Sequence, residues 1–121
     1  MQERISDAEL AIMEILWTES PLTATDVAER VTERDWSLAT VKTLLSRLLA
    51  KAAIEHKQDG RRFLYTPAVE RTDYVADESR RLVDRLFGGK FMPLVAHLAE
   101  QEQLTKADID EIERLLREMK S

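Results

Sequence analysis

An amphipathic helix followed at once by a short hairpin, in residues 35–62, constrains the fold more than any other part of this sequence. The segment reads DWSLATVKTLLSRLLAKAAIEHKQDGRR. Ser37 is a favourable helix N-cap. Apolar residues then recur at helical spacing at Val41, Leu44, Leu45, Leu48 and Leu49. The pattern predicts a helix that packs one face on a small core and leaves the other face in solvent.

The outer face of this predicted helix carries small and polar side chains. Small residues let a helix enter the major groove of DNA, while Thr, Lys and Arg are suited to contact base edges and phosphates. We therefore interpret the helix as a DNA-recognition element. Its candidate DNA-binding residues are Ser37, Ala39, Thr40, Lys42, Thr43, Ser46 and Arg47.

A β-hairpin is predicted directly after this helix. Residues 54–58 and 61–66 flank Asp59-Gly60, a dipeptide that favours tight hairpin turns. An isolated hairpin is marginally stable in water, so we expect Ile54, Phe63 and Tyr65 to pack on the helices. Lys57, Arg61 and Arg62 would then lie at the tip and reach a phosphate backbone. The hairpin is thus predicted to be a DNA-binding wing.

Two further helices are predicted before the recognition helix. Ser6 and Glu9 have the spacing of a capping box, and Pro21 follows the apolar stripe of this first helix. Thr23 opens a short second helix. Helix two, a brief turn and the recognition helix match a helix-turn-helix. We predict a winged helix-turn-helix domain over residues 1–67 in a fold that is mainly α with one small β-hairpin.

Residues 68–121 are predicted to form a helical dimerisation region. Three amphipathic segments begin near Thr72, Phe91 and Thr105, and their narrow apolar stripes cannot be buried within one short chain. A monomeric core is the alternative. The candidate interface residues are Leu82, Leu86, Phe91, Leu94, Val95, Leu98, Ile109, Ile112, Leu115, Leu116 and Met119. A two-fold dimer would place its recognition helices about 34–36 Å apart, which suits a palindromic operator.

The charge distribution favours duplex DNA as the partner. The whole chain has a net charge of −5. Residues 37–62 nevertheless carry Lys42, Arg47, Lys51, Lys57, Arg61 and Arg62 against only Glu55 and Asp59. A basic patch on an acidic protein indicates nucleic-acid binding, although scattered charge is also typical of an ordinary solvated surface. The second functional hypothesis is a winged-helix module whose basic face binds an acidic protein in a larger assembly.

Several classes of function are not expected. The chain has no cysteine, which excludes disulfides and thiolate chemistry. His56 and His97 fall in different predicted regions, so we expect neither a metal nor another cofactor. Glycine-rich phosphate loops and nucleophile elbows are missing, which argues against an enzyme. With no signal-like N-terminus and no membrane-length apolar run, we expect a cytoplasmic protein.

Three parts of the sequence together resemble the penicillinase-repressor family of winged-helix transcriptional regulators. They are SDAELAIMEILW, the segment DWSLATVKTLLSRLLAKAAIEHKQDGRRFLY and the stretch LFGGKFMPLVAHLAEQEQLTKADIDEIERLL. The resemblance covers nearly the whole chain. It implies a homodimeric repressor that occupies an operator over a promoter and leaves it when a signal arrives.

The resemblance also implies a route of release. In family members that regulate β-lactam resistance, a membrane sensor with a zinc protease domain triggers cleavage of the repressor in its C-terminal region. The matching bond here is His97-Leu98, where the staphylococcal type has Asn-Phe. Another signalling protein is the alternative partner. Copper-responsive relatives carry a C-terminal cysteine cluster, which this chain lacks.

Overall fold

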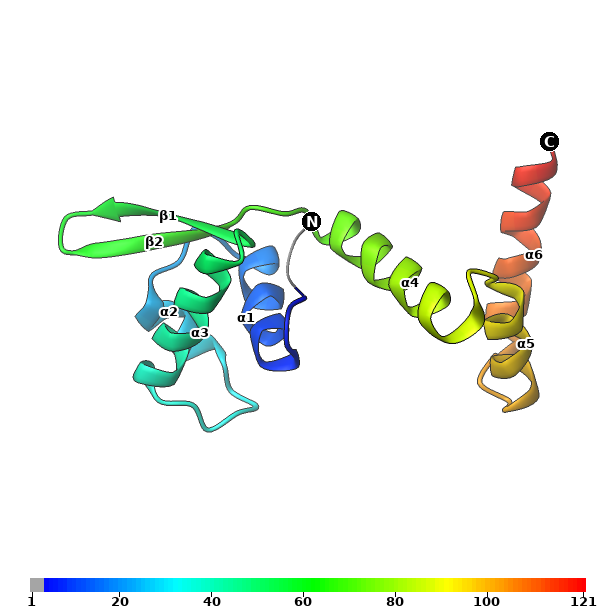
Figure 1. Ribbon diagram of the computed structural model, residues 1–121, viewed down its shortest axis with the longest axis horizontal. Coiled ribbons are helices and arrows are strands. Elements are labelled where there is room, and N and C mark those ends of the chain that lie inside the picture. Colours follow the sequence, from blue (N-terminus) through cyan, green and yellow to red (C-terminus); the bar gives the residue numbers. More distant parts are fainter. Residues whose placement is uncertain (1–3) are drawn as a thin grey trace. The chain divides into compact units, whose positions relative to one another are not determined.

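The computed structural model describes residues 4–121, so the first three residues of the predicted N-terminal domain lie outside it. Within these residues the chain forms six helices and one antiparallel hairpin (Figure 1). The elements are α1 (Asp7–Thr18), α2 (Ala24–Arg30), α3 (Leu38–Ala50), β1 (Ile54–Asp59), β2 (Arg62–Pro67), α4 (Arg71–Phe87), α5 (Met92–Glu100) and α6 (Lys106–Lys120). The predicted fold class is confirmed.

Local capping interactions begin α1, α2, α3 and α6 where the sequence predicted. The Ser6 hydroxyl accepts a hydrogen bond from the Glu9 backbone N–H at 3.2 Å, and the Glu9 carboxylate accepts one from the Ser6 N–H at 3.2 Å. The same reciprocal arrangement begins α2 and α6. At the start of α3, the Ser37 hydroxyl accepts from the Thr40 N–H at 3.2 Å. Each cap satisfies backbone donors that have no partner within the helix.

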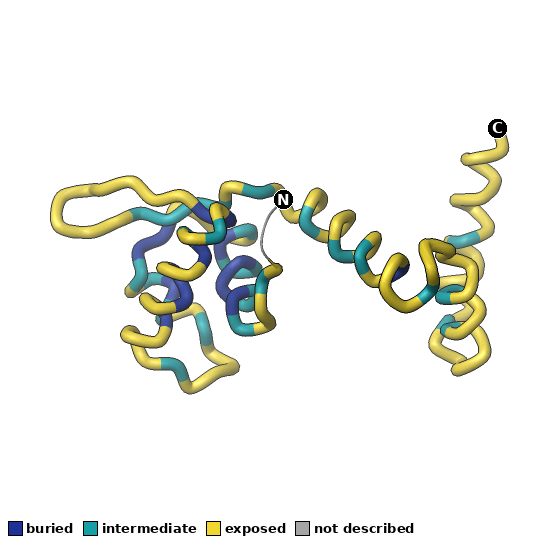
Figure 2. The backbone as a smooth tube through the Cα atoms, in the orientation of Figure 1, coloured by how far each residue is buried: buried dark blue, intermediate teal, exposed yellow. Residues whose placement is uncertain are grey.

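The hydrophobic core lies between α1, α2, α3 and the base of the hairpin. Figure 2 shows that the buried residues are concentrated in this part of the chain. The core side chains are Ile12, Met13, Leu16, Leu22, Val27, Val41, Leu44, Leu45, Leu48, Ala53 and Ile54. Four of them belong to the predicted inner face of α3. Burial of this face fixes which side of α3 is left for a partner.

The hairpin turns one residue later than the sequence predicted. Asp59 pairs with Arg62 across the strands, which leaves Gly60 and Arg61 as the loop. Gly60 has a φ of 66°, a conformation that favours glycine. The base of the hairpin is held to the loop before α2, because Tyr65 and Leu22 exchange backbone hydrogen bonds of 2.8 and 3.1 Å.

The prediction for the packing of Phe63 is wrong. Ile54 is buried and Tyr65 is half-buried against the core, as expected. Phe63 is 41% exposed and stacks on His56 with a ring-centroid distance of 4.6 Å. The physical reason is its register: Phe63 pairs with Gln58 near the tip, away from the strand ends that reach the core.

The chain divides into two compact units, the first ending at Tyr74 and the second running from Val75 to Ser121. The first unit therefore extends beyond Pro67, where the sequence placed the boundary. Trp17 helps to hold this extension. Its indole N–H donates to the Val69 carbonyl at 2.9 Å, and its ring lies 5.5 Å from that of Tyr74.

The second unit exposes most of its apolar side chains. Within residues 75–121 only Val83 is a buried hydrophobic residue. Leu86 is 59% exposed and Met119 is 81% exposed. Across residues 4–121, every helix is too short or too polar to cross the hydrocarbon core of a bilayer.

Candidate nucleic-acid interface

The exposed face of α3 and the hairpin form a polar surface next to the core. All ten predicted DNA-binding residues are exposed. Seven of them lie at the N-cap and along the outer face of α3, and Lys57, Arg61 and Arg62 lie on the hairpin. Exposure makes these side chains available to a partner, while their role in DNA binding stays a prediction.

The hydroxyl groups of Ser37, Thr40 and Thr43 already make local hydrogen bonds. Thr43 Oγ1 donates its proton to the Ala39 carbonyl at 3.0 Å. This hydroxyl therefore offers only lone pairs to a base edge, together with its methyl group. The Ser37 and Thr40 hydroxyls lie 3.1 Å apart and share one hydrogen bond. Thr43 is thus best suited to accept from a base amino group or to contact a thymine methyl.

The cationic side chains of this surface differ in their partners. Arg62 donates to Asp59 Oδ2 from both Nε, at 3.1 Å, and Nη2, at 3.0 Å. Lys42, Arg47, Lys57 and Arg61 have no hydrogen-bond or ion-pair partner among residues 4–121. None of these four charges is tied up in an ion pair with a described residue, so a phosphate can replace the solvent ions around them.

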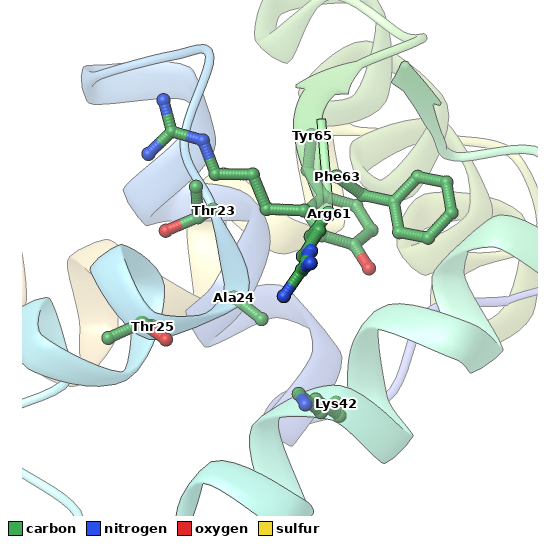
Figure 3. A pocket seen from close by; sticks show the side chains of 8 residues that line it. Thr23, Ala24, Thr25, Lys42, Arg61, Phe63 and Tyr65 are labelled. Carbon is green, nitrogen blue, oxygen red and sulfur yellow. The ribbon is translucent and has the colours of Figure 1, made fainter. Parts of the chain in front are cut away.

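A hollow of about 290 Å³ lies between α2, α3 and the hairpin, and we call it the wing hollow (Figure 3). It is lined by Thr23, Ala24, Thr25, Lys42, Arg61, Arg62, Phe63 and Tyr65. Three of these side chains are cationic and none carries a carboxylate. The structure thus brings three predicted site residues together, whereas Lys57 and the remaining α3 residues lie outside the hollow.

Five lining residues were not among the predicted site residues: Thr23, Ala24, Thr25, Phe63 and Tyr65. The sequence did mark Thr23 as a helix cap. It carried no signal that the start of α2 approaches the hairpin, because that approach depends on tertiary packing.

Asp26 lies in the first turn of α2, near the wing hollow. Hydrogen bonds from the Thr23 backbone and hydroxyl hold the pKa of Asp26 below its ordinary value, and the charge of Arg62 acts in the same direction. The Asp26 carboxylate therefore stays ionised and contributes to the field around Arg62.

Lys51 faces the protein and not the exposed surface of α3. Its ammonium donates to Glu9 Oε1 at 2.7 Å and to the Arg4 carbonyl at 2.9 Å, and its side chain is only 18% exposed. Burial raises the pKa of Glu9, but hydrogen bonds from Lys51 and Ser6 and the charge of Lys51 outweigh it and lower this pKa overall. One of the six basic residues counted in residues 37–62 therefore does not belong to the exposed basic surface.

A comparison with known protein families shows which family this chain belongs to. A family model described as penicillinase repressor matches residues 5–118. The chain belongs to the penicillinase repressor family. It is 34% identical over 119 residues to the penicillinase repressor of Bacillus licheniformis, covering 98% of this chain and 93% of that relative. It is also 34% identical over 113 residues to the methicillin resistance regulatory protein MecI of Mammaliicoccus sciuri, covering 93% and 92%.

This chain is also similar to a solved structure of a repressor bound to DNA. It is the solution structure of the Bacillus licheniformis BlaI monomeric form in complex with the blaP half-operator. The match has a TM-score of 0.52 and 39% identity, and it covers 61% of this chain and 92% of that chain. The similarity identifies the N-terminal unit as a winged-helix domain.

The names of the relatives describe repressors and regulatory proteins, in agreement with the prediction that the chain is not an enzyme. Within residues 4–121, no group of three or more His, Cys, Asp and Glu side chains is placed to hold a metal ion.

Proposed function

We propose that this chain is a sequence-specific DNA-binding transcriptional repressor that acts in the cytoplasm. The observation that carries the proposal is the exposed outer face of α3, which is held by a fully packed inner face and flanked by unpaired cations. The family and the DNA complex of the related BlaI protein support the same partner. A helix of this shape, backed by a core, fits the major groove.

Two kinds of contact with DNA have different roles, one with base edges and one with phosphates. Thr40 and Thr43 lie on the outer face of α3, where short side chains meet base edges and determine sequence preference. Lys42, Arg47 and Lys57 supply charge for the phosphate backbone. Backbone contacts set the register of the protein on the duplex, and base contacts select the site.

The second unit is proposed to form a homodimer. Seven of the eleven predicted interface residues are exposed, and the other four are only half-buried. Exposed large hydrophobic residues recur on α4 and α6, including Leu82, Leu86, Ile109 and Leu116. Apolar area of this kind is stabilised by association. A two-fold dimer presents two copies of α3 and fits a palindromic operator.

Release from the operator is proposed to follow a signal to the C-terminal region, from a membrane sensor protease or another signalling protein. The candidate bond, His97-Leu98, lies inside α5. His97 is exposed and Leu98 is half-buried, so the bond lies at the surface of the unit. Cleavage at this point would divide the segments that carry the apolar interface and weaken the dimer.

Selection of bound fragments from a random duplex pool, followed by sequencing, tests the proposed function. We expect enrichment of a palindromic motif whose half-sites are about one helical turn apart. Recovery of no duplex at low salt, together with binding to an acidic protein, would favour the protein-interaction module.

A further inference from the structure

The wing hollow has the size and charge to hold part of one DNA strand. Lys42 projects from α3 and Arg61 from the hairpin loop, so cations from two separate elements border the same space. A helix in the major groove and a hairpin beyond the groove edge have one phosphodiester strand between them. The hollow occupies this position between the two elements (Figure 3).

We propose that the wing hollow seats one backbone nucleotide of the duplex, with its phosphate between Lys42 and Arg61 and its deoxyribose against Phe63. The inference rests on the proposed DNA-binding function and assigns different roles to residues that the sequence grouped together. We call this nucleotide-binding position the seat. Arg62, in particular, is paired with Asp59 and contributes little to the seat.

Of the three cations that line the hollow, the two that we assign to the phosphate are Lys42 and Arg61. Lys42 and Arg61 have neither hydrogen bond nor ion pair within residues 4–121. A phosphate that enters between them displaces only solvent and counterions, so binding is favourable and depends on salt. None of the lining residues carries a carboxylate, and the ionised Asp26 lies outside the lining.

Arg62 differs because its guanidinium already has an anionic partner. Two of its nitrogens donate to one Asp59 oxygen, and its charge also acts on Asp26. Binding a phosphate would require Arg62 to exchange one anionic partner for another, with little net gain. Asp59 therefore limits DNA affinity by holding a neighbouring arginine.

Phe63 supplies an apolar wall to the same hollow. Its ring is 41% exposed and is stacked on His56 at 4.6 Å, so the exposed ring is already held in one orientation. A sugar ring is the apolar part of a nucleotide backbone and fits against an aromatic face. Because this contact carries no charge, it is independent of salt.

A methylphosphonate scan on a duplex selected by the wild-type protein tests the seat. Each backbone phosphate is replaced in turn by a neutral methylphosphonate, and affinity is measured for wild type, Lys42→Ala, Arg61→Ala, Arg62→Ala and the control Arg71→Ala, which removes an exposed arginine outside the hollow. We expect one position whose neutralisation weakens wild type several-fold but has little further effect on Lys42→Ala or Arg61→Ala. Each of these two variants lowers the salt slope by about 1, Arg62→Ala lowers it by less, and Arg71→Ala leaves it unchanged.

Two more variants separate the roles of charge and packing. Asp59→Asn frees Arg62 and should strengthen binding and steepen the salt dependence. Phe63→Ala should weaken binding several-fold with the salt slope unchanged. All of these side chains are exposed, so the variants are expected to keep the fold, which circular dichroism checks.

Equal losses for Arg61→Ala and Arg62→Ala, or responses of Lys42→Ala and Arg61→Ala to different phosphate positions, would overturn the seat and leave DNA binding intact. If the wild-type protein selects no duplex at all, the proposed function fails together with the seat.

Discussion

Lys51 and Glu9 form a short ion pair, with 2.7 Å between Lys51 Nζ and Glu9 Oε1, that joins the end of α3 to the first turn of α1. The Glu9 side chain is only 3% exposed. Its second oxygen, Oε2, is buried and has no hydrogen-bond partner among the described residues. The ionised Glu9 carboxylate is thus stabilised by hydrogen bonds from Lys51 Nζ and from the Ser6 backbone N–H. The contact anchors the end of the proposed recognition helix.

Replacing Lys51 should destabilise the N-terminal unit. Lys51→Met leaves a buried carboxylate without its main partner, and we expect a loss of about 1–3 kcal/mol in the free energy of unfolding. Urea denaturation measures it. Arg71→Met is the matched control, because the Arg71–Glu14 ion pair is exposed and should contribute less than about 1 kcal/mol. Equal losses in both variants would contradict the anchoring role.

Stability should also depend on the ionisation of Glu9. The pKa of Glu9 is lowered in the folded protein. The ionised carboxylate therefore stabilises the fold at pH values above its ordinary pKa of 4.5. This contribution is lost as the pH falls through the lowered folded-state value. Glu9→Gln should therefore be less stable than wild type at neutral pH, and the difference should shrink in acid. Denaturation across this range checks the sign, and a difference that widens in acid would refute it.

Thr43 should determine sequence preference. Its hydroxyl proton is held by the Ala39 carbonyl, so Thr43→Val keeps the branched shape and removes the hydroxyl, with its lone pairs and its hydrogen bond to Ala39. If Thr43 accepts from a base, the preferred base at one position should change, with a cost of about 1–3 kcal/mol on the original site. Selection and sequencing measure the preference.

The matched control for this prediction is Thr18→Val on α1. Thr18 is exposed and its hydroxyl likewise donates to a carbonyl one turn earlier, that of Glu14 at 2.8 Å. It lies away from the outer face of α3, so we expect no change in preference. If Thr18→Val and Thr43→Val behave alike, Thr43 does not read bases.

The dimer should depend on the apolar side chains of the second unit. Leu116 is 49% exposed, and Leu116→Asp places a charge where we propose an apolar interface. Sedimentation velocity should then show a monomer at concentrations where wild type is a dimer. Leu38→Asp, at a 40% exposed site of the first unit, should leave the dimer intact. A wild-type monomer at all concentrations would contradict the interface.

The features that the sequence predicted well are local. The caps at Ser6, Thr23, Ser37 and Thr105 depend on side chains within one helical turn, and each begins a helix as expected. The inner face of α3 was predicted for a similar reason, because helical spacing alone places its leucines together.

The features that the sequence missed depend on register and tertiary approach. A one-residue shift of the hairpin loop puts Arg61 in the turn and pairs Arg62 with Asp59. The exposure of Phe63 follows from its distance along the strand from the core, and Lys51 turns toward α1 because Glu9 lies there. These contacts depend on strand register or on tertiary packing, and they decide which cations have protein partners.

The salt dependence of binding to a random duplex by the wild-type protein tests most directly whether the surface formed by α3 and the hairpin binds DNA. If the exposed face of α3 and the hairpin bind the phosphate backbone, the logarithm of the binding constant should fall linearly with the logarithm of salt concentration, by about 0.9 for each phosphate neutralised. We expect a steep slope that Lys42→Ala and Arg61→Ala each reduce by about 1. Absence of binding at low salt, or binding that does not change with salt, would contradict it.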